Sequence, residues 1–216
     1  MKKGNIVITV ISVIILFGFL FLVYSLTNKP QNTSFPEIAK LKPDDHIKWS
    51  STNKNILVEY SDFQCPACGN FFGFEKQIEA SGSPNLDLIK KFTFVYRHFP
   101  LFQVHPNAYA GAYAAEAAGR QGKFWEMHDL LFKNQNQWAD SPNAKDLFAG
   151  FAKSLNLDVE KFKQDEDSKE VKQRVDEDLI AAEKAGANST PTLFLNGQKL
   201  DFNSYDELLQ TLKTVQ

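Results

Sequence analysis

Residues 55–68 read NILVEYSDFQCPAC, and this stretch decides the fold. Its first part, residues 55–60, is mostly apolar and bounded by polar residues, which at this length favours a short buried strand over a helix. Pro66 stands at an early helical position, where its missing N–H costs nothing. The stretch therefore predicts a strand that runs directly into a helix, with Cys65 and Cys68 at the junction.

A second apolar run, residues 92–96, is the next strand candidate. Two strands joined by a helix form a βαβ unit, whose crossover is expected to be right-handed. Residues 105–186 then show the pattern of several amphipathic and Ala-rich helices. The order predicts an α/β fold with an all-helical insertion.

The strand pattern returns at residues 192–195. Asn196 and Gly197 follow it, and this dipeptide supplies the two positive φ angles of a type I′ turn, so a hairpin to residues 198–200 is predicted. A last amphipathic helix is expected over residues 205–214.

Residues 6–26 carry no charged side chain, and at 1.5 Å per residue they are long enough to cross a hydrocarbon core of about 30 Å. A cleaved signal peptide is the alternative, because Lys2 and Lys3 form a basic head and residues 23–25 weakly imitate a cleavage site. The apolar run exceeds the usual signal length. We predict a single-pass transmembrane anchor in the cell membrane, with residues 1–5 as a short cytoplasmic tail and an extracytoplasmic domain.

Residues 27–45 are polar and contain three prolines. This composition cannot bury enough apolar surface to fold, so a solvated linker is predicted. The folded domain is then expected over residues 46–216, with the helical insertion at about 101–186. Such a length suits one domain with its own core.

Charge is nearly balanced, with 24 Lys and Arg against 26 Asp and Glu. No broad basic field argues for nucleic acid, so the expected partners are proteins or small molecules. The sequence has no Gly-rich phosphate loop and no ligand cluster, so no cofactor is predicted.

The two cysteines of the chain are separated by Pro66 and Ala67. Zinc sites need about four ligands, and the four histidines lack the spacing that would complete one, so no metal site is predicted. A structural disulfide that closes so small a loop would stabilise little. The histidines are His46, His98, His105 and His128; His98, like its neighbour Arg97, needs no role beyond a polar strand end, and His105 and His128 are expected to satisfy helices.

Helix geometry gives a physical reason to expect redox chemistry at Cys65 and Cys68. Cys65 at the helix start faces unpaired N–H groups and the positive end of the helix dipole, which favour its thiolate. Cys68, one turn later, is expected to be more sheltered. Each unit by which the pKa of the thiol falls is worth about 1.4 kcal/mol, or about 30 mV, and a lower pKa gives a more oxidising disulfide.

The segments DHIKW, VEYSDFQCPAC, FVYRHFPL, KFWEMHDLLF and STPTLFLNG together resemble the DsbA-type thiol-disulfide oxidoreductases, in the branch with membrane-anchored members. The resemblance runs from about residue 45 onward and implies a thioredoxin core interrupted by a helical domain. It implies that Cys65 is the exposed nucleophile, that Cys68 is the resolving thiol, and that Pro66 and Ala67 tune the pair. The strongly oxidising enterobacterial type carries Pro-His where this chain has Pro-Ala.

The resemblance also implies that Pro191 is a cis-proline facing the disulfide, with Thr190 offering backbone hydrogen bonds to an extended substrate. Spacing alone favours a trans proline that opens an edge strand. Glu59 lies six residues before Cys65 in an otherwise apolar strand, where a buried carboxylate would accept a proton from Cys68. The alternative for Glu59 is an outward-facing strand position.

The predicted function is disulfide formation in reduced exported proteins, by a monomer. The resemblance implies reoxidation by a quinone-linked membrane enzyme of the DsbB or vitamin-K-epoxide-reductase type. One alternative is a reductase or isomerase of the same fold. Another is a redox-inactive module that binds peptides by β-augmentation at the Pro191 edge.

Overall fold

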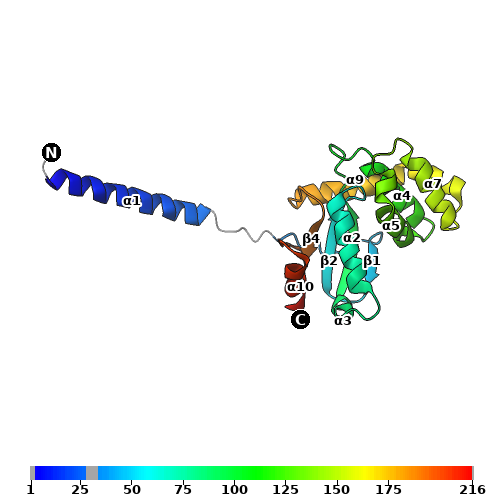
Figure 1. Ribbon diagram of the computed structural model, residues 1–216, viewed down its shortest axis with the longest axis horizontal. Helices are drawn as coiled ribbons and strands as arrows, with labels where there is room; N and C mark the ends of the chain where they lie inside the picture. Colours follow the sequence, from blue (N-terminus) through cyan, green and yellow to red (C-terminus); the bar gives the residue numbers. More distant parts are fainter. Residues whose placement is uncertain (1–2, 28–33, 216) are drawn as a thin grey trace. The chain divides into compact units, whose positions relative to one another are not determined.

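The structure is a computed structural model that describes residues 3–27 and 34–215. The chain divides into two compact units, residues 1–33 and 34–216. Each unit is described separately (Figure 1).

Helix α1, Lys3–Thr27, is the described part of the first unit. Its described side chains, those of residues 11–24, are all exposed. Among the residues whose side chains are described, no helix is both long and apolar enough to cross a membrane. The anchor over residues 6–26 therefore stays a prediction.

The second unit is built on a five-stranded sheet in the order β1-β3-β2-β4-β5. Strands β2 and β3 are parallel, and the other neighbouring pairs are antiparallel. The strands are β1 His46–Trp49, β2 Asn55–Ser61, β3 Phe92–His98, β4 Thr192–Leu195 and β5 Gln198–Lys199. The predicted strands and the Asn-Gly hairpin are confirmed; β1, short and only half-buried, gave no clear sequence pattern.

Alternation along β2 sends its side chains to opposite faces of the sheet. Leu57 packs with α2 (Pro66–Glu79) and α10 (Tyr205–Lys213) on one face. Val58 packs with α9 (Lys169–Lys184) on the other. Because Glu59 is two residues after Leu57, it shares the face covered by α2.

The helical insertion lies between β3 and β4, as predicted, and ends with α9. Figure 1 shows α4, α5 and α7 gathered beside the sheet. Before α9, the insertion contains α4 Ala108–Gly119, α5 Phe124–Lys133, α6 Gln135–Trp138, α7 Ala144–Ser154 and α8 Val159–Glu166. Outside the insertion, the short helix α3, Leu86–Ile89, precedes β3. The Trp138 ring is fully buried, and its Nε1–H donates to the Leu131 carbonyl at 2.8 Å.

The linker prediction is wrong for residues 34–45, which belong to the second unit and pack against its sheet and helix α9. Residues 28–33 lie outside the described part of the chain. The Phe35 N–H donates to the Gly197 carbonyl at 2.7 Å, and Ile38 is buried beside α9. Phe35 and Ile38 supply apolar surface that the polar average of the segment concealed.

Arg97 and Asp45 join this segment to β3. The guanidinium donates from Nε to Asp45 Oδ1 and from Nη2 to Oδ2, both at 2.9 Å. Two further donors reach the carbonyls of Ile38 and Lys40, also at 2.9 Å, and Nη1 lies 3.5 Å from the Tyr60 hydroxyl. Both charged side chains are buried, so the pair is bidentate, desolvated and well satisfied.

We expect Arg97→Met to lower the free energy of unfolding by about 3–5 kcal/mol, because it leaves Asp45 buried without its partner. The double variant with Asp45→Leu should recover a substantial part of this loss, since neither charge then remains unpaired. Denaturant unfolding of the purified proteins measures both. A double variant no more stable than Arg97→Met would contradict this account.

Candidate active site

Cys65 and Cys68 lie where β2 ends and α2 begins. Cys65 is the N-cap residue of α2, in extended conformation, and Pro66 follows it at the first helical position. Both thiols are free; Cys65 is 7% exposed and Cys68 is fully buried. Cys65 is more exposed to solvent than Cys68, as predicted, although Cys65 is itself largely buried.

The peptide bond between Thr190 and Pro191 is cis, as the resemblance implies, and the trans alternative is wrong. Cys65 Sγ lies 3.5 Å from the Thr190 carbonyl oxygen. Cys65 and Thr190 are 125 positions apart in the sequence. They meet because β4 begins directly after Pro191 and pairs with β2, the strand that leads to Cys65. The buried Thr190 hydroxyl has no hydrogen-bond partner within the described structure.

The surroundings of Cys65 favour its thiolate. A hydrogen bond from the Cys68 thiol is the largest cause and lowers the pKa of Cys65 to about 5, although burial acts in the opposite direction. The backbone N–H groups of Cys68 and Ala67 also lower this pKa. These N–H groups belong to the first turn of α2, where they have no carbonyl partner in the helix.

Cys68 has the opposite character. Burial, followed by the hydrogen bond and the negative charge of Cys65, raises the pKa of Cys68 well above its usual value. The Asp62 backbone N–H lies 3.5 Å from Cys68 Sγ and opposes this shift weakly. The reduced pair is therefore one thiolate and one thiol.

Glu59 lies beneath the pair, and its outward-facing alternative is wrong. The residue is 2% exposed, on the face of β2 that α2 covers. Burial, reinforced by the charge of Glu75, raises the pKa of Glu59 well above its usual range. Its charge also contributes to raising the pKa of Cys68, so the two groups are near neighbours.

A buried ion cluster continues from Glu59 along α2. Lys48 Nζ lies 3.1 Å from Glu75 Oε2 and 3.1 Å from Glu79 Oε1. Glu75 Oε1 is buried and has no partner among the described residues. Sequence reasoning missed this cluster; the available signal was that Cys68, Glu75 and Glu79 recur at helical spacing on one face.

Asp62 ties the cysteine junction to the helical insertion. Its Oδ2 accepts from the Leu101 N–H at 2.9 Å and lies 2.7 Å from His105 Nδ1. Its Oδ1 accepts from the Gln64 N–H at 2.8 Å. His105, expected only to satisfy a helix, thus helps to hold the active-site turn.

Gln135 makes a second tie from the insertion. Its Nε2 donates to the carbonyls of Phe63 at 2.7 Å and Cys65 at 3.0 Å. Contacts with backbone N–H and carbonyl groups leave no signal in the sequence, so the roles of Asp62 and Gln135 could not be predicted from it. His128, by contrast, is buried among aromatic rings, where burial lowers its pKa to about 3.

A groove opens beside the cysteine pair and has a volume of about 570 Å³. Ala67 and Pro191 line it on the active-site side, and Asp201, Tyr205 and Glu207 line it farther along. Ser189 and Thr192, on either side of the Thr190–Pro191 bond, also line it.

We expect the alkylation rate of reduced Cys65 to rise with pH through a midpoint of about 5, because only the thiolate attacks the reagent. Cys68→Ala should move this midpoint upward, since it removes the hydrogen bond that lowers the pKa most. Stopped-flow alkylation across a pH series measures both. A wild-type midpoint near that of an ordinary thiol would contradict the assigned thiolate.

A family model described as Thioredoxin matches residues 43–214. Solved structures with the same fold include BdbD from Bacillus subtilis, with a TM-score of 0.66 and 22% identity over 79% of this chain and 92% of that one. Another is alpha-DsbA1 from Wolbachia pipientis, with a TM-score of 0.66 and 20% identity over 84% and 96%. A Corynebacterium diphtheriae structure with this fold, MdbA, is described as a thiol-disulfide oxidoreductase; it has a TM-score of 0.61 and 18% identity over 85% and 96%.

Curated relatives carry a different name. The Na(+)/H(+) antiporter NhaA 1 of Salinispora arenicola is 39% identical over 158 residues, covering 73% of this chain and 22% of that protein. The Mycolicibacterium vanbaalenii antiporter NhaA 1 is 36% identical over 187 residues, covering 84% and 28%. The chain thus spans about a quarter of the length of these relatives. Because the thioredoxin model extends from just before the first strand to the end of the last helix, this chain belongs to the thioredoxin family.

Proposed function

We propose that this chain is an extracytoplasmic thiol-disulfide oxidoreductase that forms disulfide bonds in exported proteins. The observation that carries the proposal is the unequal pair: a Cys65 thiolate at the start of α2, beside the Thr190 carbonyl, and a buried Cys68 thiol. The names of the structural neighbours support it. Antiport is not carried over, because the match is confined to a quarter of each antiporter.

The reaction begins with the disulfide between Cys65 and Cys68. A client thiolate attacks Cys65 Sγ, the bond between the two cysteines breaks, and Cys68 leaves and takes up a proton. A second client thiolate then attacks the client sulfur of the mixed disulfide, and Cys65 leaves as a thiolate. Two electrons pass from the client to the pair, which ends as one thiolate and one thiol.

The lowered pKa of Cys65 favours oxidation of the client and reduction of the cysteine pair. A thiol of low pKa is the better leaving group, so Cys65 departs readily in the second step. Once the pKa of Cys65 lies below the ambient pH, each further unit stabilises the reduced pair by about 1.4 kcal/mol, or about 30 mV. A redox titration against glutathione separates an oxidase from a reductase or isomerase.

Glu59 supplies the proton that Cys68 takes up, and it accepts that proton in the reverse reaction. Its burial and raised pKa bring it toward the range in which a carboxyl exchanges protons with a thiol. The charge of Glu75 raises the pKa of Glu59, and the charge of Lys48, which is ion-paired with Glu75, lowers it.

Substrate and redox partners follow from the same site. An extended client segment would bind along the Pro191 edge and hydrogen-bond the Thr190 backbone. The reduced pair would pass its electrons to a quinone-linked membrane enzyme of the DsbB or vitamin-K-epoxide-reductase type. Residues 6–26 would hold the chain in the membrane as a single-pass anchor.

Cys68→Ser should accumulate mixed disulfides, because the Cys65 thiolate survives while the thiol that releases it is absent. Cys65→Ser should trap nothing and lose activity. Non-reducing electrophoresis after acid quenching measures the adducts. Equal trapping by both variants would contradict the assignment, and a redox-inactive peptide binder would trap nothing in either.

Glu59→Gln extends this experiment in the presence of both cysteines. We expect slower resolution and transient adducts, because the carboxyl that exchanges a proton with Cys68 is absent. Thr93→Val, at a buried position of the neighbouring strand β3, is the control. Unchanged resolution in Glu59→Gln would remove Glu59 from the mechanism.

The anchor predicts that the intact chain stays with membranes after carbonate washing. Protease added outside should release a domain that begins no later than about Ser34, because the backbone of residues 34–45 packs against that domain. Amino-terminal sequencing of the released fragment measures this. A mature chain that begins directly after residue 25 in untreated cells would establish a cleaved signal instead.

A further inference from the structure

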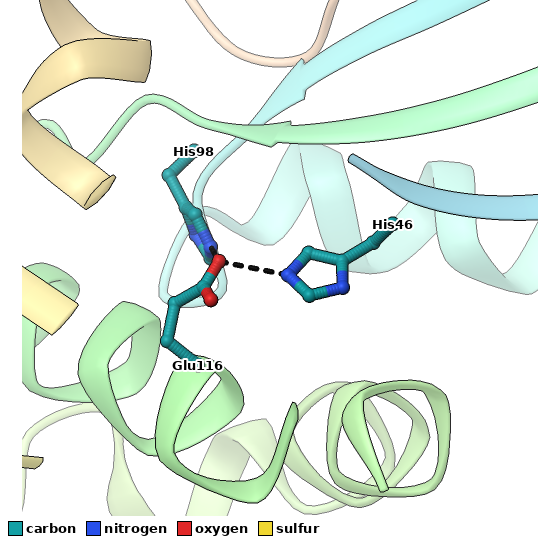
Figure 2. Close-up of side chains that lie close together, drawn as sticks. All are labelled: His46, His98 and Glu116. Atoms are coloured by element: carbon teal, nitrogen blue, oxygen red, sulfur yellow. Dashed lines mark hydrogen bonds and ion pairs between the residues drawn. The ribbon is translucent and has the colours of Figure 1, made fainter. Parts of the chain in front are cut away.

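Two histidines and a glutamate that the redox chemistry does not use meet in the second unit. His46 begins β1, His98 ends β3, and Glu116 lies in α4. Each histidine Nε2 lies 2.8 Å from Glu116 Oε1. Figure 2 shows the three side chains converging on one point, and one ligand atom from each lies within 4.8 Å of the others.

The surroundings hold these side chains in place. The His98 side chain is 1% exposed, that of Glu116 10% and that of His46 16%. The His46 ring stacks on the Phe124 ring, with 3.3 Å between the ring centroids and an angle of 4° between the ring planes. A Cβ at Gly119 would lie 3.3 Å from His46 Cε1, so the glycine leaves room for the imidazole.

A network of charged side chains lies beside the cluster, and the charge of Glu116 helps to raise the pKa of one member, Arg174. Three cations pair with three aspartates, and Glu116 is the fourth carboxylate. Burial alone would raise the pKa of Glu116, but hydrogen bonds from the two histidines hold it well below its usual value. The three cations are Lys42, Arg97 and Arg174, and the aspartates are Asp44, Asp45 and Asp178.

We infer that His46 Nε2, His98 Nε2 and Glu116 Oε1 form a binding site for a divalent transition-metal ion of the zinc type. Two imidazoles and one carboxylate are a known protein ligand set for Zn²⁺, with a fourth position left for water. Ca²⁺ and Mg²⁺ prefer sites made entirely of oxygen. The ion would link β1, β3 and α4, and so join the sheet to the inserted helices.

Residues that hydrogen-bond the metal ligands, the second coordination shell, determine how tightly the ion is expected to bind. Binding through Nε2 moves the histidine proton to Nδ1, and His98 Nδ1 is buried with no partner in the described part of the chain. Ligating histidines normally donate this proton, and loss of such a partner weakens metal binding by about 10–100-fold. We therefore expect reversible binding that a chelator removes.

The test uses the full chain in detergent with Cys65 and Cys68 oxidised, so that thiolates cannot bind the metal. One equivalent of Zn²⁺ should bind and raise the melting temperature, as expected for a ligand that binds the folded state. Co²⁺ should give a d–d spectrum without thiolate charge transfer. Ca²⁺ at the same concentration should do neither.

Glu116→Gln keeps an oxygen that accepts both histidine hydrogen bonds, so the fold should persist while Zn²⁺ affinity falls at least tenfold. His46→Gln should weaken binding similarly, and His105→Gln, outside the cluster, should bind as the wild type does. Circular dichroism checks that each variant is folded. Absence of saturable Zn²⁺ binding by the oxidised wild type, or equal affinity in Glu116→Gln and wild type, would overturn the site. Neither result depends on the redox activity of the cysteines.

Discussion

The structure depends on how β2 passes into α2. The strand is buried on both faces, so the helix that follows must begin within the protein, with the Cys65 thiol at its first turn and Cys68 beneath it. An unpaired helix start favours negative charge, and a buried position disfavours it. Two chemically identical side chains three residues apart therefore acquire opposite proton affinities, which thiol-disulfide exchange requires.

The insertion supports this junction. Asp62 receives hydrogen bonds from the segment after β3, and Gln135 of α6 holds the carbonyls of Phe63 and Cys65. Movement of the insertion relative to the sheet would shift the turn that carries the thiols. The inserted helices thus help to place the reacting sulfur against the Thr190 carbonyl.

The two faces of the sheet carry different kinds of charge. Beneath α2, Glu59, Glu75 and Lys48 form a buried cluster whose proton affinities are altered. On the opposite face, Arg97 and Asp45 form a fully paired bidentate interaction that fixes residues 34–45. The first arrangement suits proton exchange with a thiol, and the second suits stability, since it leaves no donor of Arg97 unused.

The sequence by itself determined the order of strands and helices from β2 onward, the unequal positions of Cys65 and Cys68, and the hairpin at Asn196 and Gly197, because these follow from local periodicity and turn geometry. The cis bond before Pro191 was expected only through the resemblance. Tertiary structure alone decided the packing of residues 34–45, the ties of Asp62 and Gln135, and the meeting of His46, His98 and Glu116. These depend on strand order and on contacts between residues far apart in the chain, and neither periodicity nor spacing encodes which distant side chains share a volume.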